Sequence, residues 1–283
     1  MDRFSYAAEA IPAMAIAASQ AKHNQPIYQR MLEALRHAPK FFLPDDGKAL
    51  PVEDGTYLAY SDMLPDNWRL PFPAIVLEFQ NTGDNREMFG NALVAYCPKR
   101  ICVAWEEANG FACAWSISWW KDRNIWLPSL CGTTWLRNPT RLRYLGDVSL
   151  INQYIQAAAR AGMPDPEKAL YAENASDCLS VPILCAALAC KNVSTQFVPP
   201  PERLNRRRIA RGKIPFDGYH VLVLSSKAKA DDAALGTHSS PREHLRRGHI
   251  RRLDSGNIWI NATVVNPGVG ARVSKDYRVR AFA

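Results

Sequence analysis

The sequence lacks the features that identify several large classes of protein. It has no apolar run of about 18 residues, so we expect neither a transmembrane helix nor a signal peptide. It has no C-x-x-C pair, and its 7 cysteines are odd in number, so neither a zinc ribbon nor a disulfide framework is indicated. Reduced and mostly buried thiols are the expected state of these cysteines.

Motifs of common enzymes are also missing. There is no G-x-x-x-x-G-K-S/T, G-x-G-x-x-G, H-E-x-x-H or G-x-S-x-G, so nucleotide-hydrolysing, dinucleotide-binding, zincin and α/β-hydrolase activities lack support. A two-metal nuclease needs carboxylates that converge on one site, whereas the acidic residues of the N-terminal region are scattered. A solvated strand edge accounts for Glu78 and for the Glu106–Glu107 pair. We therefore expect no cofactor and no metal site.

Positive charge is concentrated in the C-terminal third of the chain. Residues 203–252 contain 13 Lys or Arg and 4 Asp or Glu, a net charge of +9, whereas residues 1–202 carry −3. Such asymmetry within one chain favours a polyanionic partner for the basic region, most simply nucleic acid.

Hydrophobic periodicity predicts an α+β fold with N-terminal helices, a central Trp-rich antiparallel sheet and a basic β-rich C-terminal lobe. A stiff connector from Phe197 to Pro201 predicts a division into residues 1–196 and 197–283, with the second region packed on the same sheet. Asn109-Gly110 is a two-residue hairpin signal. The predicted helices are 5–20, 26–38, 147–163 and 176–190, and the predicted strands are 56–60, 74–79, 92–96, 101–105, 111–119, 219–225, 258–265 and 272–280.

One face of the predicted strand 111–119 is wide and apolar. An aromatic stripe of this kind can be a base-stacking platform, but such platforms carry interleaved Lys or Arg. The opposite face here carries Ala and Ser, so we predict that the stripe belongs to the core. With period 2, its members are Phe111, Cys113, Trp115, Ile117 and Trp119.

A basic cluster with 6 cations in 11 residues begins at Arg203. These charges repel one another, and release of counterions from bound phosphates offsets that cost. The alternative is a solvated basic face that binds nothing specific. The nucleic-acid contacts predicted in this cluster are Arg203, Arg206, Arg207, Arg208, Arg211 and Lys213.

A second basic cluster, residues 237–252, contains histidines as well as arginines. An S-x-x-E capping box with Pro241 at the first helical position predicts a short helix that ends at Gly248. Beyond it we expect an extended segment in which His249 and Arg251 share one side. The nucleic-acid contacts predicted here are Arg242, Arg246, Arg247, Arg251 and Arg252.

The second cluster also carries the candidates for catalysis. Histidine titrates near neutral pH, and two imidazoles can cleave RNA without a metal, one accepting the 2′-hydroxyl proton and the other protonating the leaving oxygen. His244 and His249 are assigned these roles. Arg246 or Arg251 would stabilise the phosphorane, and Tyr277 is a further polar candidate.

Four segments carry a family resemblance: residues 69–79, 204–215, 242–251 and 275–279. The third reads Arg-x-His-x-Arg-Arg-Gly-His-x-Arg and the fourth contains Lys-Asp-Tyr. In order and spacing these segments resemble a widespread family of bacteriophage and prophage proteins of uncharacterised function. The resemblance implies a phage origin and expression in a bacterial cytoplasm, and it transfers no activity.

Three functions follow as hypotheses from these residues. The first is a nucleic-acid-binding protein, with RNA favoured over DNA. The second is a metal-independent ribonuclease that uses the paired histidines. The third is a phage inhibitor whose basic lobe docks on an acidic surface of a host protein.

Overall fold

The computed structural model describes residues 5–22, 24–49, 68–82, 97–107, 111–137, 140–224, 244–246, 249–260 and 263–265. The chain forms two units, the first made of residues 1–188 and 195–223 and the second of residues 189–194 and 224–283. The division expected at residue 197 differs from this one, because residues 195–223 belong to the first unit. The strands expected at 56–60, 92–96 and 272–280 lie outside the described residues.

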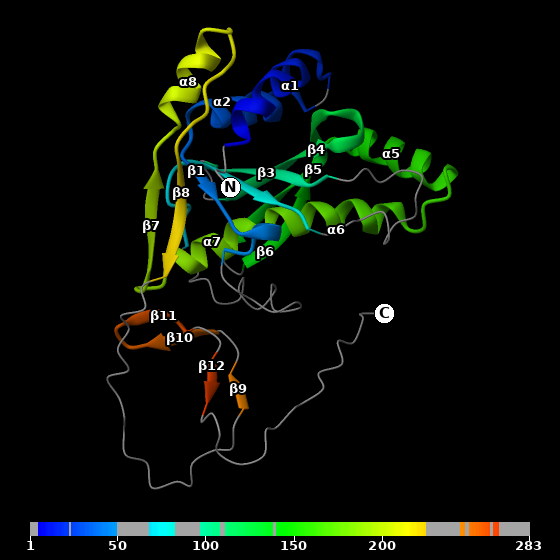
Figure 1. Cartoon of the computed structure of the whole chain (residues 1–283). Coiled ribbons are helices and arrows are strands. Elements are labelled where there is room, and N and C mark those ends of the chain that lie inside the picture. Colours follow the sequence, from blue (N-terminus) through cyan, green and yellow to red (C-terminus); the bar gives the residue numbers. More distant parts are fainter. Residues whose placement is uncertain are drawn as a thin grey trace, which may run out of the picture. The chain divides into compact units, whose positions relative to one another are not determined.

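An eight-stranded sheet organises the first unit, in the order β6-β5-β4-β3-β2-β1-β8-β7 (Figure 1). Neighbours from β2 to β6 pair antiparallel, whereas β1 pairs parallel with both β2 and β8. The α+β class is therefore confirmed, but the sheet is mixed rather than antiparallel throughout. Its strands are β1 (Lys40–Phe42), β2 (Ala74–Gln80), β3 (Lys99–Glu106), β4 (Ala112–Trp120), β5 (Ile125–Arg137), β6 (Thr140–Leu145), β7 (Val193–Val198) and β8 (Tyr219–Leu224).

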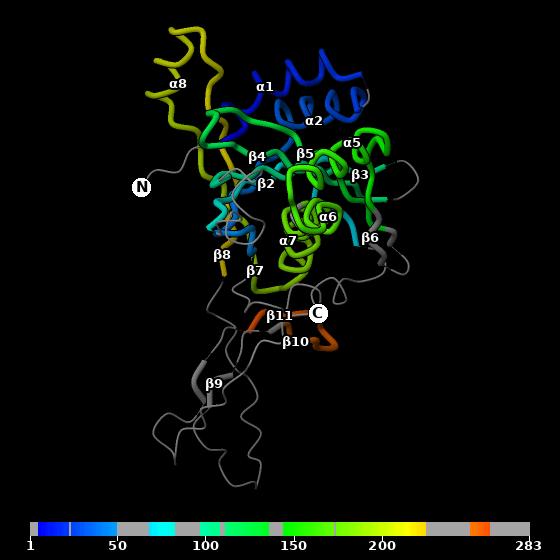
Figure 2. Tube along the Cα trace, turned by 90° about the vertical axis from the view of Figure 1, so that its right-hand side faces the viewer, coloured from blue at the N-terminus to red at the C-terminus, as the bar shows by residue number. Residues whose placement is uncertain are grey.

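Helices cover both faces of this sheet: α1 and α2 lie on one, and α6 and α7 lie on the other (Figure 2). The helices expected at 5–20, 26–38 and 147–163 are confirmed, whereas the stretch 176–190 contains the end of one helix and the whole of the next. None of the helices in the described part of the chain has both the length and the apolar character needed to cross a membrane. The helices are α1 (Ala7–Gln20), α2 (Gln25–His37), α5 (Val148–Arg160), α6 (Pro166–Cys178), α7 (Ser180–Leu188) and α8 (Glu202–Ile209), with short 3-10 turns η1 (Asp45–Gly47) and η2 (Lys121–Arg123).

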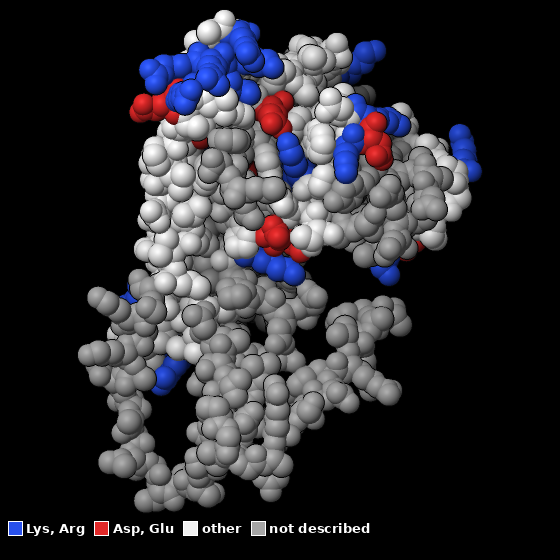
Figure 3. All heavy atoms as spheres, in the orientation of Figure 1, with Lys and Arg blue, Asp and Glu red and all other residues white. Residues whose placement is uncertain are grey.

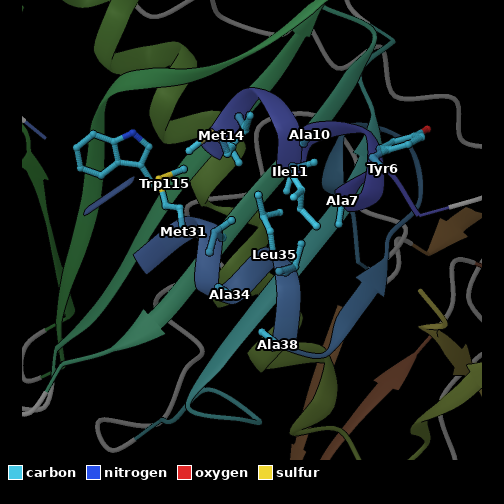
Figure 4. Close-up of a cluster of buried hydrophobic side chains, with 14 of the residues drawn as sticks. Tyr6, Ala7, Ala10, Ile11, Met14, Met31, Ala34, Leu35, Ala38 and Trp115 are labelled. Atoms are coloured by element: carbon cyan, nitrogen blue, oxygen red, sulfur yellow. The ribbon is translucent and has the colours of Figure 1, made fainter. Parts of the chain in front are cut away.

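The main core lies between the sheet and the helices α1 and α2 (Figure 4). The side chains of Met14 and Met31 are fully buried there, together with the Trp115 indole of β4. Trp115 meets the ring of Tyr28 edge-on, with 6.4 Å between the ring centroids. The core interpretation of the 111–119 stripe is confirmed for Cys113, Trp115 and Ile117, while Trp119 is partly buried against the same core and Phe111 is outside it. Trp115 has no free ring face for a base.

The opposite face of β4 carries small residues that let α6 approach closely. Ala114 and Ser116 are buried beneath the helix, and Asn174 of α6 donates through Nδ2 to the carbonyl oxygen of Cys131 at 2.6 Å. Arg100 and Asp177 form a buried ion pair in the same layer, with 3.3 Å between Nη1 and Oδ2. All 7 cysteines are free and buried, so the burial expected for them is confirmed.

Glu78, in the middle of β2, caps the N-terminus of α1. Its carboxylate accepts hydrogen bonds from Ser5 Oγ at 2.8 Å and from the backbone N–H groups of Tyr6 at 2.7 Å and Ala7 at 3.0 Å. These donors would otherwise lack acceptors at a buried helix start. The side chain is fully buried, so the solvated-edge interpretation was wrong for Glu78. Burial raises its pKa to about 7, although the three hydrogen bonds and Lys40 favour the charged form.

The described residues of the second unit form two small antiparallel sheets. One pairs β10 (His249–Leu253) with β11 (Gly256–Ile260), and the other pairs β9 (His244–Arg246) with β12 (Thr263–Val265). Asn192 fastens the chain to β11, because its side chain donates to the Trp259 carbonyl oxygen at 2.7 Å and accepts from the Trp259 N–H at 2.8 Å. The single strand expected at 258–265 is therefore divided: its first residues belong to β11 and its last residues to β12.

Candidate nucleic-acid interface

The first basic cluster forms helix α8 and the turn that follows it. Pro201 precedes the helix in an extended conformation, and Glu202 lies in the first turn with arginines in the last, as the helix dipole favours. After the helix, the N–H of Gly212 donates to Ile209 O at 2.9 Å and the N–H of Lys213 to Arg208 O, also at 2.9 Å. Gly212 has φ +65°, in the left-handed region that favours glycine, so the chain can reverse at this point.

Two side chains on the inner side of α8 hold the returning chain against the helix. Asn205 donates through Nδ2 to the carbonyl oxygen of Phe216 at 2.7 Å and accepts from the Phe216 N–H at 2.8 Å. Arg208 donates through Nε to Ile214 O at 2.7 Å, and its guanidinium lies 3.9 Å from the centroid of the Phe216 ring. Phe216 itself is buried, so these contacts fix α8 to the body of the first unit.

The outer side of α8 and its turn carries exposed cations that we call the α8 basic face. Spacing of three and four residues places Arg203, Arg206 and Arg207 on one side of the helix, and Figure 3 shows Lys and Arg side chains gathered over α8. No ion pair within the described part of the chain involves any cation of this face. The α8 basic face consists of Arg203, Arg206, Arg207, Arg211 and Lys213.

Arg208 differs from the other predicted contacts in this cluster. Its side chain is partly buried and is used in the Ile214 and Phe216 contacts. The structure therefore gives Arg208 a positioning role beneath the α8 basic face, rather than a place on it.

The second basic cluster lies in the second unit and does not form the expected helix. Residues 244–246 are strand β9, with Leu245 opposite Val264 of β12. A helix of two turns with one apolar residue is marginal without packing, and pairing with a β-branched strand outweighs the capping signal. Arg251 and Arg252 are exposed on β10. Arg242, Arg247 and Tyr277 lie outside the described residues.

The candidate catalytic histidines belong to different sheets. His244 is in β9, opposite Val265, and His249 is in β10, opposite Ile260. The extended conformation expected for His249 and Arg251 is confirmed, and Arg246 ends β9. Among the strands that the structure describes, no pairing joins the two histidines.

The carboxylates at the end of β3 are paired with arginines. Glu107 Oε1 accepts from Arg30 Nη1 at 2.8 Å and from Trp105 Nε1 at 2.7 Å. Glu106 accepts from the Leu70 N–H at 2.9 Å and lies 3.4 Å from Arg69 Nη1. These bonds connect α2 and residues 69–70 to the sheet, and the described residues contain no cluster of metal-ligating side chains.

Comparison with protein-family models, curated proteins and solved structures finds no match to this chain. The charge run in the sequence located the α8 basic face, but not the contacts that hold it. Asn205 and Phe216 are 11 positions apart, and no local periodicity relates them. One sign in the sequence indicated that the chain turns back after the helix, namely Gly212, a turn residue inside the basic run.

Proposed function

We propose that this protein binds nucleic acid and that the α8 basic face contacts the phosphates. The observation that carries the proposal is a set of exposed cations without ion-pair partners in the described part of the chain, on a helix whose inner side is fixed. Because α8 is already held in place, its backbone loses little conformational freedom on binding, and phosphates release their counterions when the cations replace them. Both effects favour a polyanion over a small anion.

The test is the salt dependence of binding to labelled RNA and DNA, with EDTA present. Each phosphate contact contributes roughly 0.7 to 0.9 to the slope of log affinity against log salt concentration. Replacing Arg203, Arg206 and Arg207 together by alanine should reduce the slope by about 2 to 3 and weaken binding to every sequence alike.

A charge-matched control separates local contact from net charge. Lys121, Arg160 and Lys168 are exposed cations on other elements, and their joint replacement by alanine removes the same charge. We expect the control to keep nearly all of the slope. An equal loss in both variants, or no binding at low salt, would contradict the proposal, and capture of an acidic protein instead would favour the host-protein hypothesis.

Binding, rather than cleavage, is proposed because the α8 basic face supports it, whereas His244 and His249 belong to different sheets. The same samples report cleavage directly. Strand scission that disappears in both His244→Ala and His249→Ala would add a ribonuclease activity to the binding function.

A further inference from the structure

A cluster of aromatic rings lies on the sheet beside α8. The His220 ring on β8 is 5.2 Å from Phe41 of β1, 5.3 Å from Phe197 of β7 and 6.5 Å from Phe72, measured between ring centroids. Phe41 is buried, but Phe197 is 55% exposed and Phe72 is 40% exposed. We call Phe72, Phe197 and His220 the aromatic surface. Exposed apolar rings that gather around one residue are a feature of binding sites.

The Phe197 ring has a defined position although it is exposed. It lies directly on Gly218, where a Cβ atom would overlap the ring and would lie 2.9 Å from the carbonyl oxygen of Val198. A side chain at position 218 would therefore displace the ring. A ring held in this way can receive a second planar group on its free face without first losing rotamer freedom.

Two members of the aromatic surface, Phe197 and His220, belong to the same continuous segment of the first unit as the α8 basic face. β7 leads into α8 and β8 leads out of it (Figure 1), so Phe197 and His220 lie at the α8 end of their strands. Gly218 beneath Phe197 is two residues from Phe216, which Asn205 fastens to α8. Phe197, His220 and the exposed cations are thus carried by the same β7–α8–β8 segment.

From this arrangement we propose that the ligand is a single-stranded nucleic acid, whose bases stack on the aromatic surface while its phosphates contact the α8 basic face. The inference rests on the proposed function. Single-strand binders combine a basic track with aromatic rings, because every base has a face that can stack. A duplex hides those faces in its own stack, so it would use the cations and leave the rings exposed.

The test compares three probes of one length, about 12 nucleotides, which lies within the roughly 4 to 16 that such surfaces cover. They are a single strand, an abasic strand with the same phosphates, and a duplex. The full-length protein should bind the single strand on the order of 10-fold more tightly than the abasic strand. Phe197→Leu should remove this difference and leave abasic binding unchanged, whereas the alanine variant of Arg203, Arg206 and Arg207 should weaken both.

Tyr144→Leu is the matched control. Tyr144 is a 40% exposed aromatic residue on β6, at the other edge of the same sheet. We expect it to bind all three probes like the unchanged protein. Phe197→Tyr keeps a ring that can stack and should retain the preference for bases, which separates lost stacking from a folding defect in Phe197→Leu.

The two proposals fail in different ways. Equal affinity for the single and abasic strands, or tighter binding of the duplex, would overturn the stacking inference and leave phosphate binding intact. Loss of the base preference in Tyr144→Leu as well as in Phe197→Leu would also overturn it. Failure to bind any probe at low salt would overturn both proposals.

Discussion

Replacing Glu78 by glutamine should change how the stability of the protein depends on pH. The Glu78 carboxyl is fully buried and receives three hydrogen bonds from the start of α1. Glutamine keeps the size of the side chain and an acceptor oxygen, but it does not titrate. The difference between the two proteins therefore isolates the protonation of this one group.

The expected magnitude follows from the shift in pKa. Burial raises the pKa of Glu78 from 4.5 to about 7. Between these values the folded chain holds a proton that the unfolded chain has released, so unfolding becomes more favourable as the pH rises. A difference of about 2.5 in pKa corresponds to about 3 kcal/mol. This contribution is fully present below pH 4.5 and is lost as the pH rises through 7.

The assay is urea unfolding between about pH 4 and pH 8, followed by tryptophan fluorescence, with the pH range set by the two pKa values. Trp115 and Trp126 belong to the core that α1 covers, so their emission reports on it. We expect the unfolding free energy of the unchanged protein, relative to Glu78→Gln, to fall by about 3 kcal/mol over this range. Glu167→Gln, which removes an exposed carboxyl, is the control.

Two results would refute this reasoning about Glu78. A constant difference between the proteins at all pH values would mean that Glu78 does not change its protonation on unfolding. A difference that grows with pH would mean that the three donors and Lys40 outweigh desolvation, and that the pKa of the buried carboxyl is lowered.

Three further substitutions probe other parts of the structure. Asn205→Ala removes both hydrogen bonds to Phe216 and should cost about 2 kcal/mol of local stability, seen as faster amide exchange in α8, together with weaker RNA binding. Gly132→Ala should destabilise the fold by about 3 kcal/mol in urea unfolding, because the new methyl group overlaps the buried Trp115 ring; an unchanged midpoint would contradict this packing. Asp147→Ala removes the side-chain cap of α5 and should cost about 1 kcal/mol, measured as a lower melting temperature.

Local sequence patterns predicted the elements whose structure is set locally. The period-2 pattern of 111–119 and the three- and four-residue spacing of 26–38 correspond to β4 and α2. In α5 the expected cap is also present, since Asp147 accepts from the N–H of Leu150 at 2.8 Å. In each of these elements, the residues that give the sequence signal lie within a few positions of the residues whose structure they predict.

The predicted strands 74–79, 101–105 and 219–225 likewise correspond to β2, β3 and β8, whereas β1 and β5 were not predicted and depend on partners far away in the chain. β5 contains Pro128 and Gly132, which normally argue against a strand, but Pro128 lies at a register shift opposite Ile117 and Gly132 leaves space for the ring of Trp115. β1 is three residues long and depends on its parallel neighbours. No periodicity within either segment contains this information.

The candidate site shows the same limit. Its charge was evident from the run of arginines, whereas the helix beneath those charges depends on Asn205 and Phe216. The aromatic surface was missed because Phe72 and Phe197 each approach His220 only after the sheet has formed. The capping box near Pro241 led to a wrong helix prediction, because it reports only on hydrogen bonds between residues close in the chain. Residues 244–246 instead form β9, which pairs with β12.

The short strand β1 has a consequence for how the protein opens. It meets β2 at three register positions, but it meets β8 at one, where Phe41 lies opposite His220. Segments joined by few backbone hydrogen bonds open as separate cooperative units. We therefore expect β8 and α8 to open as one such unit, before the ladder of β2 to β5. A ligand bound to β8 and α8 would stabilise their closed state by its binding free energy. Bound protein should therefore show slower local opening of this unit.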